Sequence, residues 1–266
     1  MRTYNPKLDG SRILLGAHRG DRKHYPENTM EAFRAAVEMG CDAIETDVRM
    51  TADGQLVLIH DRDVLRTTNA SGFVDQMTLA ELRTLDAGFW KDPAFTGARI
   101  PTVEEFLAYV SKTDVIVNWE LKEYPKELGE RAYVCVDALV ELIDRYGMAD
   151  RSIMNSYSEL LLEYVDTKWP HRFAIHGYMH YKKPKDFAQK PLESFLDWSV
   201  IWNKTEDAVA GFAEDYAFAK ERDLLCCILV PDVDSAYKQA LEMGCHMFTS
   251  DDPAEAIAIL KRLGVR

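Results

Sequence analysis

The stretch MEAFRAAVEMGCDAIETDV, residues 30–48, decides the fold class of this chain. Its first half predicts a helix over Met30–Met39, because apolar side chains recur there on one face and Asn28 can cap the N-terminus. Gly40 ends this helix, and the apolar segment Ala43–Val48 that follows predicts a buried strand. Helices that alternate with buried strands are typical of α/β proteins with a parallel sheet.

The same alternation continues along the rest of the chain. The predicted strands, eight in number, cover Arg12–Gly16, Ala43–Val48, Val115–Leu121, Ser152–Asn155, Arg172–Tyr178, Ser199–Trp202, Leu224–Leu229 and Cys245–Thr249. The further predicted helices cover Leu128–Tyr146, Ser158–Lys168, Val209–Arg222, Ser235–Met243 and Ala254–Leu263. Eight such units with right-handed crossovers predict a single (β/α)8 TIM barrel domain over residues 1–266, with an open doubly wound sheet as the alternative.

A small insertion is expected between the second and third barrel strands, at about residues 51–112, because this segment is too long for a plain crossover. It begins with Asp53-Gly54, a pair that is typical of two-residue hairpin turns, and continues into the apolar run Leu56–Ile59. A two-residue turn at this pair predicts that His60 lies directly across from Asp47 on the preceding strand.

The composition excludes several classes of protein. Of the 266 residues, 47% are hydrophobic and 29% charged, which is typical of an ordered globular protein. The formal net charge of -12 disfavours broad contact with nucleic acid or anionic lipid. The apolar runs have the length of strands, so we expect no integral membrane segment, and the N-terminus shows no secretion signal. Five cysteines without Cys-x-x-Cys spacing indicate reduced thiols and a cytoplasmic location.

Carboxylates interrupt two of the predicted strands. Glu45 and Asp47 are two residues apart and therefore share one face of the strand Ala43–Val48. Like charges in a confined site repel each other, and a hard divalent cation relieves this cost most directly. Glu120 interrupts the next barrel strand, with Lys122 on the same face, near the end that forms the active-site rim of a barrel. The three carboxylates therefore predict a metal site at this rim.

Other groups suited to phosphate chemistry are expected at the same rim. The first strand places His18 and Arg19 there, an imidazole that titrates near neutral pH beside a guanidinium that fits a pair of phosphate oxygens. Together with His60 and Lys122 they suggest acid/base groups and an anion clamp around a metal, and hence phosphoryl chemistry. The alternatives are that Arg19 only anchors a loop and that Lys122 only neutralises Glu120.

An ordered set of motifs carries a family resemblance. The set comprises His18-Arg19-Gly20, Pro26-Glu27-Asn28-Thr29, Glu45-Thr46-Asp47-Val48, Asp53-Gly54, His60-Asp61 and Glu120-Leu121-Lys122. Within the insertion it continues with Leu65-Arg66-Thr67-Thr68, Gly72, Leu85-Asp86-Ala87-Gly88 and Ile100-Pro101-Thr102. In these motifs the chain resembles the glycerophosphodiester phosphodiesterase family, and the resemblance covers the first half of the chain almost continuously.

The resemblance implies a metal-dependent barrel enzyme in which Glu45, Asp47 and Glu120 bind Mg or Ca. It implies that His18 and His60 act as general acid and base, while Arg19 and Lys122 bind the substrate phosphate. The expected reaction hydrolyses a small-molecule glycerophosphodiester to glycerol phosphate and an alcohol, within lipid and glycerol metabolism. A lysophospholipase D-like cleavage of another phosphodiester and a non-catalytic barrel that binds phosphate ligands are the alternatives. The resemblance leaves open which alcohol is released, whether the metal is Mg or Ca, and the oligomeric state.

The second half of the chain resembles the family less closely. It has Ser156-Tyr157 where Ser-Phe is common, and Ser250-Asp251-Asp252-Pro253 where Thr-Asp-x-Pro is common. Many members carry Trp-Thr-Val-Asn after the seventh strand, whereas the equivalent stretch here is Ile228-Leu229-Val230-Pro231, which lacks an aromatic surface for the alcohol. We expect the mouth loops, especially Met179–Asp197, to select the headgroup. The tryptophans are expected to pack in the core or in loops, with Trp202, near a strand end, as the candidate exception.

Overall fold

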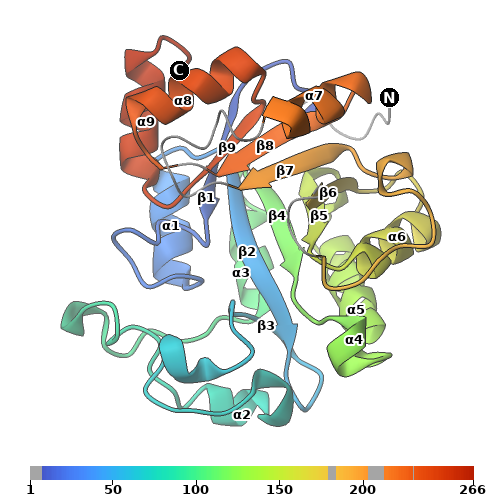
Figure 1. Cartoon of the computed structure of the whole chain (residues 1–266). Coiled ribbons are helices and arrows are strands. Elements are labelled where there is room, and N and C mark those ends of the chain that lie inside the picture. Colours follow the sequence, from blue (N-terminus) through green and yellow to red (C-terminus); the bar gives the residue numbers. More distant parts are fainter. Residues whose placement is uncertain (1–7, 179–183, 203–212, 230) are drawn as a thin grey trace.

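The computed structural model describes residues 8–178, 184–202, 213–229 and 231–266. Eight parallel strands form a closed barrel, because β1 pairs with both β2 and β9 (Figure 1). The barrel strands are β1 (Leu14–His18), β2 (Ala43–Met50), β4 (Ile116–Leu121), β5 (Ser152–Ser156), β6 (Ala174–Tyr178), β7 (Trp198–Trp202), β8 (Leu225–Leu229) and β9 (Met247–Ser250). Each predicted strand coincides with one of these, which confirms the (β/α)8 TIM barrel and excludes the open doubly wound sheet.

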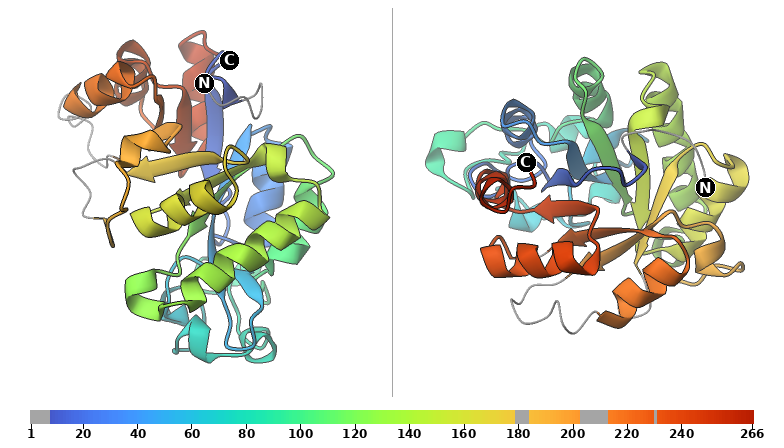
Figure 2. Two further views of the ribbon diagram at one scale, coloured as in Figure 1. Left: turned by 90° about the vertical axis from the view of Figure 1, so that its right-hand side faces the viewer. Right: turned by 90° about the horizontal axis from the view of Figure 1, so that it is seen from above.

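Helices surround the barrel (Figure 2). They are α1 (Met30–Glu38), α3 (Val103–Val110), α5 (Arg131–Arg145), α6 (Glu159–Lys168), α7 (Ala213–Glu221), α8 (Asp234–Met243) and α9 (Pro253–Arg262), with the short helices α2 (Leu79–Leu82) and α4 (Pro125–Leu128). Single 3₁₀ turns are η2 (Val64–Arg66), η3 (Val74–Gln76), η4 (Pro93–Phe95), η5 (Ala149–Arg151) and η6 (Leu192–Ser194). Between β6 and β7 the described residues form η6 in place of a barrel helix. The helix predicted from Val209 is described from Ala213 onward, and residues 179–183 of the predicted headgroup loop lie outside the described ranges.

An apolar layer closes the amino-terminal end of the barrel. The layer takes one buried side chain from each barrel strand: Leu14, Ala43, Ile116, Ile153, Ala174, Trp198, Cys227 and Met247. Successive side chains of a strand alternate between the barrel interior and the surrounding helices. Among the described side chains, those two and four positions after these floor residues therefore also face the interior, closer to the carboxyl-terminal mouth.

The strand β2 extends beyond the barrel and pairs antiparallel with β3 (Leu56–Leu58), which confirms the predicted hairpin but corrects its register. The backbone N–H of Ile59 donates to the carbonyl of Asp47 at 3.0 Å, so Ile59 and not His60 lies across from Asp47. The turn contains three residues, 52–54, because Gly54 adopts a left-handed φ of 79° that closes this longer loop. The prediction of a two-residue turn was wrong by this one residue.

The N-terminal cap of α1 is Thr29, whose side chain accepts a hydrogen bond from the backbone N–H of Ala32. The prediction of Asn28 as the cap was therefore wrong. Asn28 has a left-handed backbone with φ of 55°, and its side-chain amide donates to the carboxylate of Asp47 at 2.8 Å. The side chain that was expected to cap the helix belongs to the barrel mouth.

The segment between β2 and β4 packs in two parts. Residues 51–102 contain an apolar cluster of their own, which includes Val57 and Leu82. By contrast, α3 packs in the main core. The ring centroid of Phe106 lies 4.5 Å from that of Phe33 and 5.6 Å from that of Trp119. Since α3 is the helix of the second barrel unit, the departure from the repeat is confined to residues 51–102 of the range 51–112.

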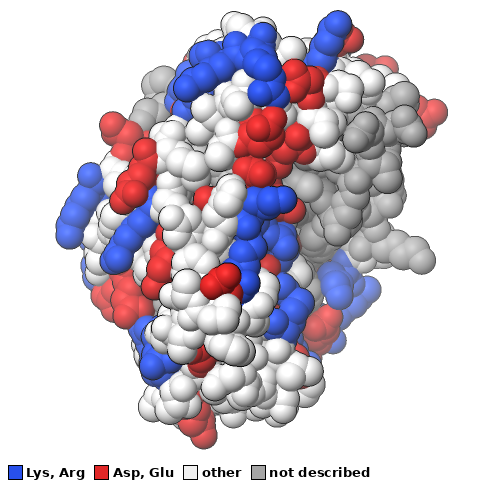
Figure 3. Space-filling model, turned by 90° about the vertical axis from the view of Figure 1, so that its left-hand side faces the viewer, with Lys and Arg blue, Asp and Glu red and all other residues white. Residues whose placement is uncertain are grey.

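The described surface carries charges of both signs. Acidic and basic side chains lie side by side on the face seen in Figure 3, so the net charge of -12 does not collect there in one acidic patch. In the described part of the chain, every helix is too short or too polar to span a bilayer.

Candidate active site

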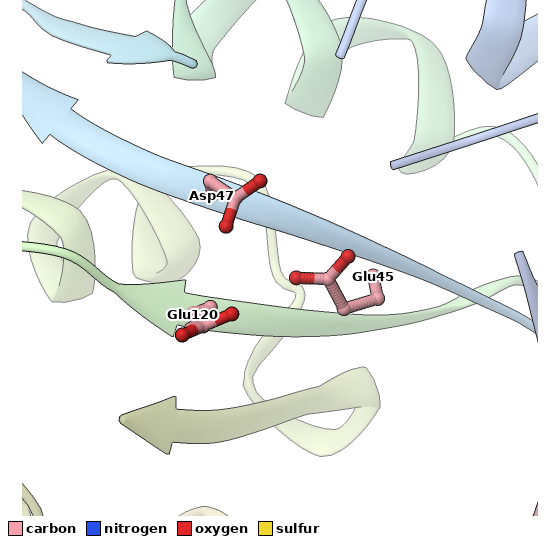
Figure 4. Close-up of side chains that lie close together, drawn as sticks. All are labelled: Glu45, Asp47 and Glu120. Carbon is pink, nitrogen blue, oxygen red and sulfur yellow. The ribbon is translucent and has the colours of Figure 1, made fainter. Parts of the chain in front are cut away.

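Three carboxylates meet at the carboxyl-terminal mouth of the barrel: Glu45 and Asp47 on β2, and Glu120 on β4 (Figure 4). The two strands are paired so that Asp47 lies opposite Glu120, which gives their side chains the same face and the same height in the barrel. One oxygen of each residue lies within 4.8 Å of the others, and all three side chains are buried. The structure thus brings the three predicted metal ligands together.

Two buried oxygens of this triad accept no hydrogen bond from the described residues. Oε2 of Glu45 accepts a hydrogen bond from the backbone N–H of Arg19 at 3.1 Å. Oδ2 of Asp47 accepts a hydrogen bond from Nδ2 of Asn28 at 2.8 Å. Among the described residues, Glu45 Oε1 and Asp47 Oδ1 have no hydrogen-bond partner. Burial, together with the charges of Asp47 and Glu120, raises the pKa of Glu45 well above its ordinary value. Because an all-carboxylate oxygen set suits hard cations, these residues fit a hard divalent cation.

The side chains of Lys122 and Arg19 flank the triad. Nζ of Lys122 lies 2.6 Å from Oε1 of Glu120 and 3.2 Å from Oδ1 of Asp47. Nε of Arg19 lies 3.2 Å from Oδ2 of Asp47. Although burial opposes ionisation, these two cations hold the pKa of Asp47 far below its ordinary value. Each cation therefore neutralises a carboxylate, and each also lines the cavity at the barrel mouth.

The two predicted catalytic histidines each contact a carboxylate through Nδ1. Nδ1 of His18 lies 2.5 Å from Oδ1 of Asp251, and Nδ1 of His60 lies 2.5 Å from Oδ1 of Asp61. Both rings line the cavity, where Nε2 of His18 lies 3.8 Å from Oε2 of Glu45. Burial lowers the pKa of His18, although the hydrogen bond to Asp251 acts in the opposite direction. The shared arrangement leaves Nε2 of both rings for chemistry in the cavity.

Glu27 is a buried carboxylate that joins three arginines of the mouth. Its Oε1 accepts hydrogen bonds from Nη1 of Arg19 at 2.8 Å and from Nη2 of Arg66 at 2.7 Å. Its Oε2 lies 3.4 Å from Nη2 of Arg22. Arg66 also donates from Nε to Asp61 at 2.5 Å. Although burial opposes ionisation, Arg66 and Arg19 lower the pKa of Glu27 to about 2. Glu27 therefore links the His60–Asp61 pair to the arginine beside the triad.

The cavity at this mouth has a volume of about 610 Å³. Apart from the charged groups, its wall includes Tyr157, Tyr178, Val200, Leu229 and Pro231. The rings of Tyr157 and Tyr178 stack with their centroids 3.8 Å apart. The stretch that replaces Trp-Thr-Val-Asn thus contributes aliphatic wall, while residue 230 and the side chain at position 202 lie outside the described parts of the structure.

Several residues that build this mouth were not predicted from the sequence to belong to it. They are Glu27, Asn28, Asp61, Arg66 and Asp251. Each lies inside one of the motifs that carry the resemblance, and this position was the available signal. Their partners come from segments 5 to 233 residues away, apart from the adjacent His60–Asp61 pair, so their contacts emerge only in the folded barrel.

Fold and mouth together define a (β/α)8-barrel protein with a buried carboxylate triad that fits a divalent cation. The chain belongs to the glycerophosphoryl diester phosphodiesterase family, whose model matches residues 18–266. It is 42% identical over 161 residues to a glycerophosphodiester phosphodiesterase of Caldanaerobacter subterraneus subsp. tengcongensis, a match that covers 60% of this chain and 64% of that relative. The chain therefore matches less than two thirds of that relative's length.

Solved structures resemble the chain over nearly its full length. A putative glycerophosphoryl diester phosphodiesterase from Silicibacter pomeroyi has a TM-score of 0.82 at 23% identity, with 97% of this chain and 98% of that chain covered. An Oleispira antarctica phosphodiesterase in complex with the product sn-glycerol-3-phosphate has a TM-score of 0.80 at 25% identity, with 93% and 96% covered. Both support the barrel fold described above.

Proposed function

We propose that this chain is a metal-dependent phosphodiesterase that hydrolyses glycerophosphodiesters to glycerol phosphate and an alcohol. The observation that carries the proposal is the placement of two histidine–carboxylate pairs beside a buried carboxylate triad at one barrel mouth. Membership of the family supports the reaction class. The sn-glycerol-3-phosphate bound as product by the Oleispira antarctica relative supports glycerol phosphate as the product here.

The proposed metal ligands are Glu45, Asp47 and Glu120, which would hold Mg or Ca. A divalent cation at this position supplies electrostatic stabilisation of the negative charge that develops on the phosphoryl oxygens. Arg19 and Lys122 bind and orient the same phosphate, because both line the cavity beside the triad and both carry N–H donors.

In the proposed reaction, His18 and His60 move protons through Nε2. One imidazole accepts the proton of the water or substrate hydroxyl whose oxygen bonds to phosphorus, and the other donates a proton to the alcohol oxygen whose bond to phosphorus breaks. Attack by a substrate hydroxyl gives a cyclic phosphate, which water then opens to glycerol phosphate. Asp251 and Asp61 hold Nδ1 of the two rings and stabilise their protonated forms. The pairing therefore supports an acid and a base on separate segments that face one cavity.

A lysophospholipase D-like cleavage is the second candidate. The observation that favours it is the aliphatic wall formed by Val200, Leu229 and Pro231, which offers apolar contact to a lipid alcohol. A soluble glycerophosphodiester and a lysolipid, assayed side by side, distinguish the two candidates.

The test of the proposed function is the release of glycerol phosphate from a panel of glycerophosphodiesters and one lysolipid, with Mg, with Ca and with chelator. We expect metal-dependent turnover of at least one soluble diester, and we expect Glu45→Gln to abolish it. Turnover of the lysolipid alone would move the assignment to the second candidate. Binding of a diester without any turnover would support the non-catalytic barrel instead.

We also propose a cytoplasmic location for the chain. All five cysteines are free and buried, which is the state expected in a reducing compartment. A fractionation experiment with the full-length protein tests this proposal.

A further inference from the structure

The side chain of Arg49 lies behind the mouth, on the same face of β2 as Asp47 and two residues after it in the chain. It is only 7% exposed and does not line the cavity. Its Nε and Nη2 donate to the carbonyl of His60 at 3.0 and 2.8 Å, and its Nη1 donates to the carbonyl of Lys122 at 3.1 Å. One guanidinium thus binds the backbone of two residues that the proposed mechanism uses.

Arg49 lies just beyond the point where β4 separates from β2, while β3 is still paired with β2 here, because Val57 lies opposite Arg49. At the end of β4, the backbone N–H of Lys122 donates to the carbonyl of Val48. Where β3 leaves β2, the backbone N–H of Ile59 donates to the carbonyl of Asp47. Within the described residues, the carbonyls of His60 and Lys122 accept hydrogen bonds only from Arg49. Arg49 therefore supplies hydrogen-bond donors to two carbonyls that lie just beyond the ends of β3 and β4, where the strands no longer provide a partner.

The charge of Arg49 is balanced away from the cavity. Its Nη1 lies 3.5 Å from Oε1 of the buried Glu123, and Oε2 of Glu123 lies 3.9 Å from Nε of Arg131 on α5. Arg131 donates hydrogen bonds to the carbonyls of Met50 and Thr51, and not to those of His60 or Lys122. Both arginines therefore lie beside the carboxylate of Glu123, but only Arg49 binds the backbone of His60 and Lys122.

We propose that Arg49 is a positioning residue that fixes His60 and Lys122 on either side of Asp47 by binding their carbonyls. The inference rests on the proposed function for the roles of His60 and Lys122, while the contacts themselves do not depend on it. A planar guanidinium binds two carbonyls in different directions at once, which an ammonium group does not do with the same geometry. Small displacements of groups that act on the substrate lower turnover strongly.

The test compares Arg49→Gln and Arg49→Lys with the matched control Arg131→Gln, which removes a cation from the same Glu123 without touching the rim. The measurements are kcat and KM on a soluble diester, the thermal midpoint of unfolding, and crystal structures of the variants. We expect Arg49→Gln to lower kcat about 10- to 100-fold and to displace His60 or Lys122. Arg131→Gln is expected to lower the thermal midpoint comparably and to retain kcat within about threefold.

The variant Arg49→Lys separates charge from geometry. We expect a higher thermal midpoint than in Arg49→Gln, because the lysine still neutralises Glu123. We expect kcat to stay low, because the ammonium group does not bind both carbonyls with the geometry of the guanidinium. Full recovery of kcat, or an equal loss of kcat in Arg131→Gln, overturns the proposal. If the wild type hydrolyses no diester, the proposed function fails, and the crystal structures alone then decide the positioning role: unmoved His60 and Lys122 overturn it, and displacement supports it.

Discussion

At the scale of single residues, Asp251 and Asp61 determine which nitrogen of each histidine faces the cavity. Each carboxylate lies 2.5 Å from Nδ1 of its histidine, so the ring is oriented before substrate binds. We expect Asp251→Asn to lower kcat by about 10- to 100-fold, because the amide keeps the shape but no longer stabilises a protonated His18. Steady-state kinetics measures this effect.

The control for this prediction is Asp234→Asn, which makes the same charge change in a surface ion pair with Arg262 on α9. We expect this variant to retain the kcat of the wild type. An Asp251→Asn enzyme with unchanged kcat would remove Asp251 from the mechanism.

Glu27 carries a second prediction at this scale. Its folded-state pKa of about 2 lies below the ordinary value of 4.5, so its contribution to stability is present above pH 4.5 and is lost as the pH falls through 2. A difference of this size corresponds to about 3 kcal/mol. We expect Glu27→Gln to lower the free energy of unfolding by that order at pH 7, and by much less at pH 2 to 3. Urea unfolding of both proteins across this range measures it, and a pH-independent difference would contradict the assignment.

At the scale of elements, the loop after β1 depends on Gly20. Gly20 has a left-handed φ of 77°, and a Cβ there would lie 2.6 Å from the backbone carbon of Ala32 in α1. The loop is held by a backbone bond from Asp21 to the carbonyl of Ala32 at 3.0 Å. We expect Gly20→Ala to push the loop from the helix and to displace Arg19, with loss of both stability and turnover.

Gly40 provides the matched control for Gly20. It also has a left-handed φ, 84°, but no atom lies within 4 Å of an added Cβ. Gly40→Ala is therefore expected to cost only the backbone strain, about 1–2 kcal/mol, without loss of turnover. Equal thermal midpoints for the two variants would show that contact with α1 does not constrain the loop.

The same elements show how far the sequence predicts the structure. Periodicity located all eight barrel strands, since buried strands require continuous apolar runs that are visible locally. The hairpin register was missed because Asp53-Gly54 fits both a two-residue and a three-residue turn, and the choice depends on packing of β3 against its neighbours. The cap of α1 was missed because Thr29 and Asn28 are both good caps, and Asn28 is taken by Asp47.

At the scale of the whole molecule, the barrel brings together carboxylates from different strands in one buried site. Glu45, Asp47 and Glu120 come together only when β2 and β4 pair, and the sequence predicted this from the side-chain period and the position of the rim. The supporting contacts of Glu27 and Asp251 were not predictable in the same way. They depend on how the insertion and the last barrel loop fold over the mouth, which local pattern does not specify.

The stability of the whole chain should depend on a divalent metal ion. If residues 1–266 form a single domain, thermal unfolding should show one cooperative transition. A cation that binds only the folded barrel raises stability by about 2.7 kcal/mol at a concentration of 100 Kd, so Mg or Ca should raise the thermal midpoint. Glu45→Gln should lose this rise, yet be more stable than the wild type in chelator, because burial and repulsion disfavour the Glu45 carboxylate.

Calorimetry of both proteins with metal and with chelator measures these changes, with Glu141→Gln on the exposed face of α5 as the control. We expect the control to follow the wild type under both conditions. Lys122 and Arg19 offset part of the charge of the triad, and a bound cation would offset the rest, so the gain in stability from metal should depend on Glu45. A Glu45→Gln protein that still gains stability from Mg and Ca would place the metal elsewhere and undo the assignment of the triad.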